Sequence, residues 1–303
     1  MVTREPMSAV EFDVGEVIIG HVSNTSFDHP IIHLPELFGI NFSVTKHVLM
    51  LWIVASIVFV VITGCIRKYQ RQERAIPSGF MNGLEAVVQF IRDSIVVPNV
   101  GAKFANTWTP LILTFFFFIL TANGIGLIPI FDLLGTVDHF VLHTGDHSFI
   151  KQLLHGGTTA TANYNVTAGL ATITFFSIII AGTLAHGFFN HWKNLVPHGM
   201  SWPVYFILIP IEVIAMFVKP FALTMRLAAN MMGGHIAILA ILSFVFIFNG
   251  MQGALAGIGV GLVVSVPMAV GVSCLELIVV LVQSYVFTIL TAVFIGMAIN
   301  VHH

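Results

Sequence analysis

The chain has 303 residues, of which 57% are hydrophobic and only 9% are charged, and its mean hydropathy is +0.95. This composition excludes an ordinary soluble domain and predicts an integral membrane protein. A net charge of −2 gives no electrostatic reason to expect a nucleic-acid partner. The two cysteines, Cys65 and Cys274, lie in apolar tracts and predict neither a disulfide framework nor a CxxC metal site.

The first apolar segment, residues 47–66, matches the ~20 residues that a helix needs to cross a bilayer. Residues 1–45 contain Arg4 as their only basic residue, whereas four basic residues crowd the other flank: Arg67, Lys68, Arg71 and Arg74. By the positive-inside rule, residues 1–45 are therefore expected outside the membrane. Lys46 stands at the outer end of the span, where we expect its side chain to snorkel to the interface.

Residues 77–101, PSGFMNGLEAVVQFIRDSIVVPNVG, have apolar residues at helical spacing but are too polar to span. They predict an amphipathic helix in the inner interface, with a helix packed against other spans as the alternative. Residues 108–130 are long enough to cross outward and residues 167–189 to return, so a two-helix transmembrane hairpin is expected. A polar outer loop at 133–166 separates the two.

Three histidines in that loop, His139, His143 and His147, are spaced as metal ligands on one helix would be. Thr144 and Gly145 weaken such a helix. We therefore interpret the segment as an exposed histidine-rich loop and expect no metal site.

Two nearly unbroken apolar tracts, residues 203–248 and 253–299, end the chain. As one helix the second tract would be ~70 Å long, more than twice the ~30 Å of the hydrocarbon core. Each tract is therefore either two spans or one very oblique helix, and hydropathy does not choose between them. Possible bends are marked by prolines, namely Pro203, Pro210, Pro220 and Pro267.

Four charged residues lie inside these tracts: Glu212, Lys219, Arg226 and Glu276. A charge at mid-bilayer costs ~2.5–3.5 kcal/mol on insertion scales, so such residues are expected to face a cavity or a partner and to mark an ion path. The first three are seven residues apart and share one helix face. For Arg226 the alternative is a buried ion pair with one of the two glutamates that only docks helices, and for Lys219 it is snorkelling.

Uncharged polar residues extend the two helix faces. Asn230 lies near the stripe of Arg226, whereas His235 points to the opposite side of an ideal helix. Gln283 is seven residues after Glu276, on the same face. Interhelical hydrogen bonding is the structural alternative to a functional role for Asn230 and Gln283.

Five sequence stretches together carry a resemblance to a known family, one of them PSGFMNGLEAVVQFI at 77–91. MRLAANM at 225–231 resembles the R-L-x-x-N-M motif of the a subunit of F-type ATP synthases, the stator half of a rotary proton motor. NGIGLIP at 123–129, ANYNVTAGLA at 162–171 and LVQSYVFTIL at 281–290 are similar to further segments of that family. The resemblance covers residues from about 30 to 300 in the same order.

The resemblance implies an all-α membrane fold with an N-terminal transmembrane helix, an interfacial helix, a hairpin and two long tilted helices, in one membrane domain over 46–303. It implies that Arg226 is the family's essential arginine, with Asn230 its neighbour and Gln283 facing it. His235 and Glu276 match a coupled pair in the proton channel, exchanged between the helices as in the mitochondrial arrangement. Glu212 and Lys219 also fall at recognisable family positions. Asn163 stands where many relatives have an aspartate, and Asp132 would supply the missing carboxylate in this chain.

The resemblance also implies a function. The chain would conduct protons through two offset half-channels against a rotor ring of c subunits, separated by the arginine, with subunit b of the peripheral stalk, the other synthase subunits and membrane lipid as partners. No G-x-x-x-x-G-K-[ST] sequence is present, so we expect no nucleotide site, no cofactor and no catalysis by this chain alone. The alternatives are a secondary transporter whose arginine binds an anion, although we find no internal repeat, and a structural scaffold.

The expected location is a bacterial inner membrane, with the N-terminus outside and the C-terminus inside. This expectation rests on the resemblance and on the start of the chain, which has neither a signal-peptide nor a transit-peptide pattern. A mitochondrial inner membrane is the alternative.

Overall fold

The computed structural model describes residue 15 and residues 43–70, 79–127, 159–193 and 202–300. Within these residues the fold is built from helices, which agrees with the all-α membrane class. Five helical segments are long and apolar enough to cross a membrane: α2 (Lys46–Gln70), α5 (Ala102–Leu127), α8 (Tyr164–His186), α10 (Trp202–Gln252) and the run Ala254–Ile299. The chain is thus a multi-pass membrane protein.

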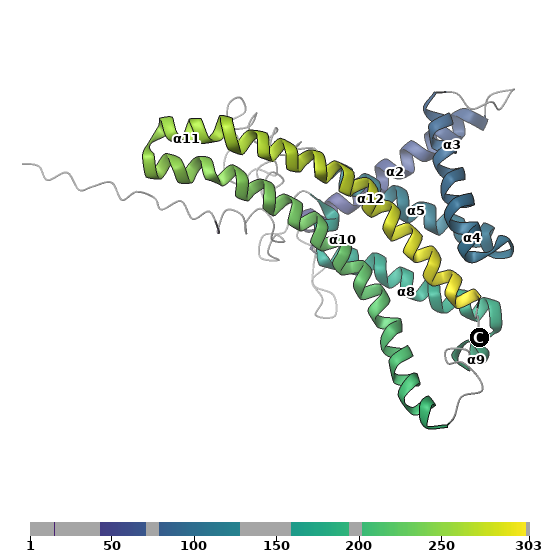
Figure 1. Ribbon diagram of the computed structural model, residues 1–303. Coiled ribbons are helices and arrows are strands. Elements are labelled where there is room, and N and C mark those ends of the chain that lie inside the picture. The colour runs from purple at the N-terminus through teal and green to yellow at the C-terminus, as the bar shows by residue number, and fades with distance from the viewer. Residues whose placement is uncertain (1–14, 16–42, 71–78, 128–158, 194–201, 301–303) are drawn as a thin grey trace, which may run out of the picture.

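The two C-terminal tracts form a pair of long helices that run side by side from their connection and diverge toward their far ends (Figure 1). The first is a single helix of 51 residues, α10, which continues through Pro210 and Pro220. The second run consists of α11 (Ala254–Val260), a π-helical turn η4 (Gly261–Ser265) and α12 (Val266–Ile299). Gly253 joins the two with a φ of 88°, a conformation that only glycine adopts readily. Each tract is therefore one long helical run.

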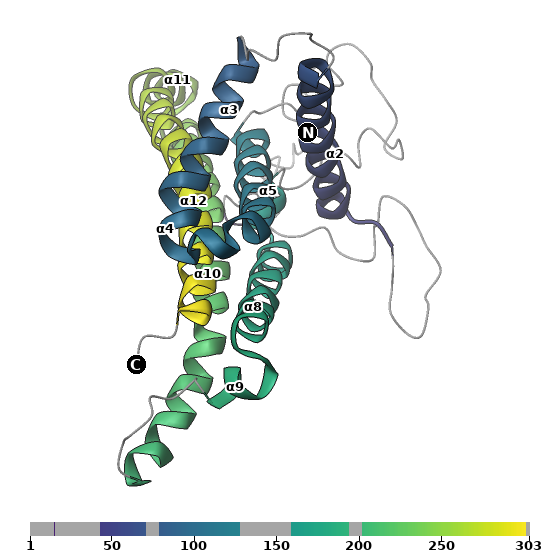
Figure 2. The same ribbon diagram turned by 90° about the vertical axis from the view of Figure 1, so that its right-hand side faces the viewer.

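The hairpin helices α5 and α8 pack against the long pair (Figure 2). One core cluster is formed by side chains from α5, α8, α10 and α12: Phe115, Ile119, Ala171, Leu223, Leu227 and Phe287. Phe115 and Phe287 meet edge to face, with ring centroids 5.5 Å apart. Because lipid tails are as apolar as these side chains, van der Waals packing and not the hydrophobic effect holds the helices together.

The segment after the first span consists of α3 (Phe80–Phe90), the π-helical turn η1 (Ile91–Val96) and α4 (Val97–Val100). α3 has no buried residue, whereas Ile91, Ile95 and Val100 belong to a second core cluster that they form with side chains of α5, α8 and α12. α3 thus resembles the predicted interfacial helix, whereas η1 and α4 follow the alternative of a helix packed against other spans. Gly296 of α12 permits this packing, because a Cβ there would collide with the backbone of α4.

The first span, α2, stands apart from the rest over most of its length (Figure 2). Its buried residues all lie in its first nine positions, namely Lys46, His47, Met50 and Val54. The expectation that Lys46 snorkels is wrong for this fold, since its side chain is 0% exposed. Snorkelling is unnecessary because α5 and the helical turn η3 (Ala160–Ala162) cover this end of α2.

The sequence placed the first three spans to within six residues, and the two long helical runs follow the tracts expected at 203–248 and 253–299. The first span was expected at 47–66 and runs from Lys46 to Gln70, and the hairpin helices differ from 108–130 and 167–189 by at most six residues at either end. Several expectations fall outside the described residues, namely those for Asp132, the three loop histidines, residues 1–14 and 16–42, and loop positions 133–158.

Candidate functional site

Arg226 lies on an exposed face of α10. Within the described part of the chain, its guanidinium has no hydrogen bond or ion pair, so the docking pair with Glu212 or Glu276 is not formed there. Apolar side chains on the same stretch of helix are also exposed, including Phe217, Phe221 and Met225. A permanent charge on an apolar face would be costly in lipid, so this face is one that a partner or water must meet.

The next turn of α10 is tied to α12 by a side-chain hydrogen bond. Asn230 Nδ2 donates to Gln283 Oε1 at 3.1 Å, and Gln283 is only 3% exposed. Both residues were predicted as members of one site, and they meet although 53 positions separate them in the sequence. The bond fixes the position of α10 against α12 one turn away from the arginine.

His235 and Glu276 form the second predicted group. His235 Nδ1 lies 3.5 Å from Glu276 Oε1, with side-chain exposures of 23% and 3%. This is an ion-pair distance and is longer than a hydrogen bond. The Glu276 carboxyl lies close against the backbone of α10 at Gly234. A Cβ on that glycine would lie only 2.7 Å from Glu276 Oε1. A glycine at this position is therefore what lets the carboxyl reach the histidine.

Sequence reasoning missed the residues that complete this second group. Thr159 Oγ1 lies 2.7 Å from His235 Nε2, and two residues later Thr161 donates a hydrogen bond to Asn123 Oδ1 on α5. Thr159 is buried, and Thr161 and Asn123 are buried completely. They carry no charge, so a search for charges in apolar tracts passes over them. Their signal in the sequence is the polar spacing inside TTATAN at 158–163 and the asparagine of the NGIGLIP motif.

A buried polar cluster continues from these residues to the start of α2. Its members there are Ser43, Thr45, Lys46 and His47, all at most 7% exposed. Met50 of α2 packs on Ala160 of η3, which brings the two segments together. Nδ2 of Asn123 and Nδ1 of His47 are buried with no hydrogen-bond partner among the described residues. Buried polar atoms of this kind are usually satisfied, commonly by ordered water, so this end of the bundle is suited to hold water.

The remaining predicted residues are more dispersed. Glu212 and Lys219 are half-buried on α10, and the Lys219 ammonium lies 5.7 Å from the ring centroid of Phe294 on α12. Asn163 is the N-cap of α8, where its Oδ1 accepts from the backbone N–H of Asn165 at 2.8 Å. This capping role is a sufficient structural reason for an asparagine there.

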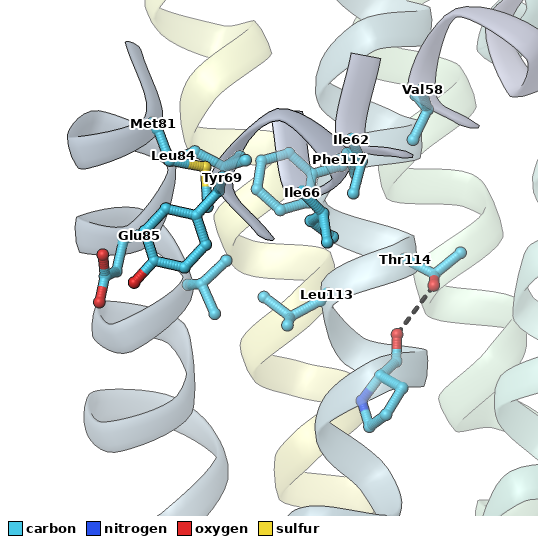
Figure 3. A pocket seen from close by; sticks show the side chains of 12 residues that line it. Val58, Ile62, Ile66, Tyr69, Met81, Leu84, Glu85, Leu113, Thr114 and Phe117 are labelled. Atoms are coloured by element: carbon cyan, nitrogen blue, oxygen red, sulfur yellow. Dashed lines mark hydrogen bonds between the residues drawn. The ribbon is translucent and has the colours of Figure 1, made fainter. Parts of the chain in front are cut away.

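A cavity of about 480 Å³ lies away from this site, between α2, α3 and α5 (Figure 3). Its lining is almost entirely apolar, with Glu85, Tyr69 and Thr114 as the polar exceptions. The Thr114 hydroxyl already donates to the Pro110 carbonyl at 2.8 Å. None of the predicted site residues that the structure describes lines this cavity. Among the described residues, no three His, Cys, Asp or Glu side chains are grouped as metal ligands would be.

Comparison with known sequences shows the family. A sequence model described as "ATP synthase A chain" matches residues 48–296, which include both groups of site residues. The chain belongs to the ATP synthase A chain family. The match includes α5, α8 and α10 completely, and nearly all of α2 and of the last run, Ala254–Ile299.

Bacterial relatives in this family align over most of the chain. "ATP synthase subunit a 2" of Chlorobium luteolum is 39% identical, over 97% of this chain and 78% of the relative. The protein of the same name from Prosthecochloris aestuarii is 38% identical, over 94% of this chain and 79% of the relative. "ATP synthase subunit a" of an Anaeromyxobacter species is 38% identical over 89% of this chain, which spans only 57% of that relative.

Proposed function

We propose that this chain is the proton-conducting stator subunit of a rotary F-type ATP synthase, itself without catalytic activity. Two half-channels, open to opposite sides of the membrane and displaced from each other, meet at Arg226. The observation that carries this proposal is the exposed arginine on α10 beside the anchored Asn230–Gln283 pair, in a chain of this family. A purely structural arginine would be paired inside the bundle.

The arginine suits a barrier between two channels because it cannot relay a proton. A guanidinium stays charged at any working pH. A positive charge nearby lowers the pKa of a carboxyl by ~1–3 units. A rotor carboxyl that approaches the arginine is therefore favoured in its ionised form. A protonated rotor site therefore releases its proton on reaching Arg226, and the arginine blocks direct passage between the channels.

The partner that this function needs is a ring of c subunits on the exposed face of α10 and α12. α12 has exposed apolar side chains of its own, such as Leu281 and Val282, which are 54% and 51% exposed. Subunit b and the other synthase subunits would hold the stator in place, and membrane lipid would surround α2. We place the N-terminus outside and the C-terminus inside a bacterial inner membrane, with residues 46–303 as one membrane domain.

The second group, His235 and Glu276, would serve the half-channel that includes the buried polar cluster around Asn123 and Lys46. Both side chains can take up and release a proton, and they lie within 3.5 Å of each other. The driving force is the membrane potential, ~2.3 kcal/mol per charge per 100 mV, together with the pH difference. The remaining predicted residues, Glu212, Lys219, Asp132 and Asn163, keep only a supporting part in this proposal.

The test is Arg226→Ala in the assembled complex. ATP-driven acidification of inverted membrane vesicles should be lost, while a ring of small subunits still copurifies with the chain in mild detergent. Passive proton leak should rise, because the barrier between the channels is gone. The matched control is Arg92→Ala, which removes an exposed arginine whose ion pair with Asp93 is on the surface. Normal pumping by a correctly assembled Arg226→Ala complex would overturn the proposal.

A further inference from the structure

His235 is held between two partners on its two ring nitrogens. Thr159 Oγ1 lies 2.7 Å from Nε2, and Glu276 Oε1 lies 3.5 Å from Nδ1. The three side chains come from three segments: the residue before η3, α10 and α12. A neutral imidazole has one nitrogen that donates and one that accepts, so the partner at each nitrogen influences which of the two carries the proton.

The hydroxyl of Thr159 is fixed by its contacts with α5. Gly126 leaves the space for it, because a Cβ on Gly126 would collide with the Thr159 side chain. Thr161 donates to Asn123, which lies three residues before Gly126 and therefore on the same face of α5. The segment is thus attached to α5 at two neighbouring points, and Thr159 is only 1% exposed. Its side chain has little freedom to leave His235.

We propose that Thr159 is a positioning residue for proton transfer through His235, an inference that rests on the function proposed above. A hydroxyl both donates and accepts, so it stays bonded to Nε2 whether that nitrogen is bare or protonated. Transfer through the ring requires both forms. Water in the half-channel supplies a proton to Nε2 as the Thr159 hydroxyl turns its hydrogen away, which gives the imidazolium. The Nδ1 proton then passes to the Glu276 carboxylate, and the neutral ring is left with its proton on Nε2. Thr159 donates to Nε2 before this step and accepts from it afterwards.

Two substitutions of Thr159 separate this role from packing. Thr159→Val keeps the shape that fills the space beside Gly126 but removes the hydroxyl, whereas Thr159→Ser keeps the hydroxyl and removes the methyl group. In assembled complexes in inverted vesicles, loss of this hydrogen bond should slow ATP-driven acidification about five- to tenfold in Thr159→Val. Thr159→Ser should stay within about twofold of the unsubstituted protein, because the bond is kept.

The opposite order, with valine active and serine slow, would show that Thr159 acts by packing alone and would overturn the inference. Equal rates in the two variants, whether normal or slow, would overturn it as well. A second variant, Gly126→Ala, should slow pumping by displacing Thr159, whereas Gly124→Ala should not, since nothing lies within 4 Å of a Cβ there. Arg226→Ala is measured in parallel: if it pumps normally, the proposed function fails, and if only Thr159→Val pumps normally, this inference alone fails.

Discussion

The two groups of polar residues on α10 differ in how they meet their surroundings. Arg226 is exposed and has no partner among the described residues, and the nearby Asn230–Gln283 bond holds the helix rather than the guanidinium. Nine residues further along, His235 is mostly covered and lies between a threonine and a glutamate. One group is open to another chain, and the other is enclosed by this chain.

This difference teaches which kind of change each group should tolerate. An exposed cation acts through its charge, so the side chain itself is essential whereas its immediate neighbours have some freedom. An enclosed proton carrier depends on distances of a few tenths of an ångström, because hydrogen bonds weaken steeply outside their range. Substitutions of small neighbours should therefore harm the enclosed group and spare the exposed one.

The largest effect in the enclosed group is expected from Glu276→Gln. The amide keeps the volume but cannot exchange protons with His235, so pumping should fall by about tenfold or more. The pH profile of pumping should also change, because a titrating group has been removed. Vesicle acidification measured across a pH series tests this, with Glu85→Gln on α3 as the control. A normal rate with an unchanged profile would exclude Glu276 from the proton path.

The comparison is sharpened by two adjacent glycines on α10. A Cβ on Gly234 would lie 2.7 Å from Glu276 Oε1, whereas nothing lies within 4 Å of a Cβ on Gly233. Gly234→Ala should therefore move the carboxyl and slow pumping about fivefold, by the ~1 kcal/mol that one misplaced polar contact costs. Gly233→Ala should pump normally. Equal rates in the two variants would show that the approach of Glu276 to α10 does not matter.

A smaller effect is expected where α10 is tied to α12. Asn230→Ala removes the donor to Gln283 and leaves a buried amide unpaired, so pumping should fall about three- to fivefold at ~1 kcal/mol. Asn82→Ala on the exposed α3 is the control. A decrease as large as that of Arg226→Ala would mean that Asn230 contacts the proton or the rotor directly, and that the two groups are not distinct.

The smallest effect concerns a histidine that is buried by packing. His191 lies in α9 (Phe188–Lys193) against Gly182, and burial, with a smaller contribution from the charge of His186, lowers its pKa. Because the unfolded chain then binds more protons, stability should be complete above about pH 6.5 and should fall as the pH drops below it. His191→Gln should flatten this dependence in thermal unfolding of the detergent-solubilised complex, with little change in pumping. If the dependence of thermal stability on pH is the same in His191→Gln, His191 is not the group responsible for it.

The sequence was most informative where physical constraints are strong. Span positions follow from hydrocarbon thickness, and charges such as Arg226 and Glu276 are conspicuous because apolar tracts rarely contain them. Hydropathy alone did not decide how 203–248 and 253–299 fold, since a tract twice the membrane thickness satisfies two arrangements. That question is decided by the continuity of α10 through Pro210 and Pro220.

Other features were not predictable because they depend on contacts between distant segments. Lys46 was expected at the interface, yet it is covered by segments about 80 and 115 residues away in the sequence. Thr159 meets His235 across 76 positions, and no periodicity in the sequence connects them. Asn163 is the exception, because its place directly before an apolar helix is a local signal for a helix cap.

The length of α10 has a geometric consequence for the distance between the two groups. A helix of 51 residues is ~76 Å long, so keeping both apolar ends within ~30 Å of hydrocarbon requires it to lean ~65° from the membrane normal. Arg226 and His235 are then separated by only ~5 Å in depth but by ~12 Å sideways. A step along this helix is therefore mainly a step in the plane of the membrane, which is the direction in which a rotating neighbour would have to travel.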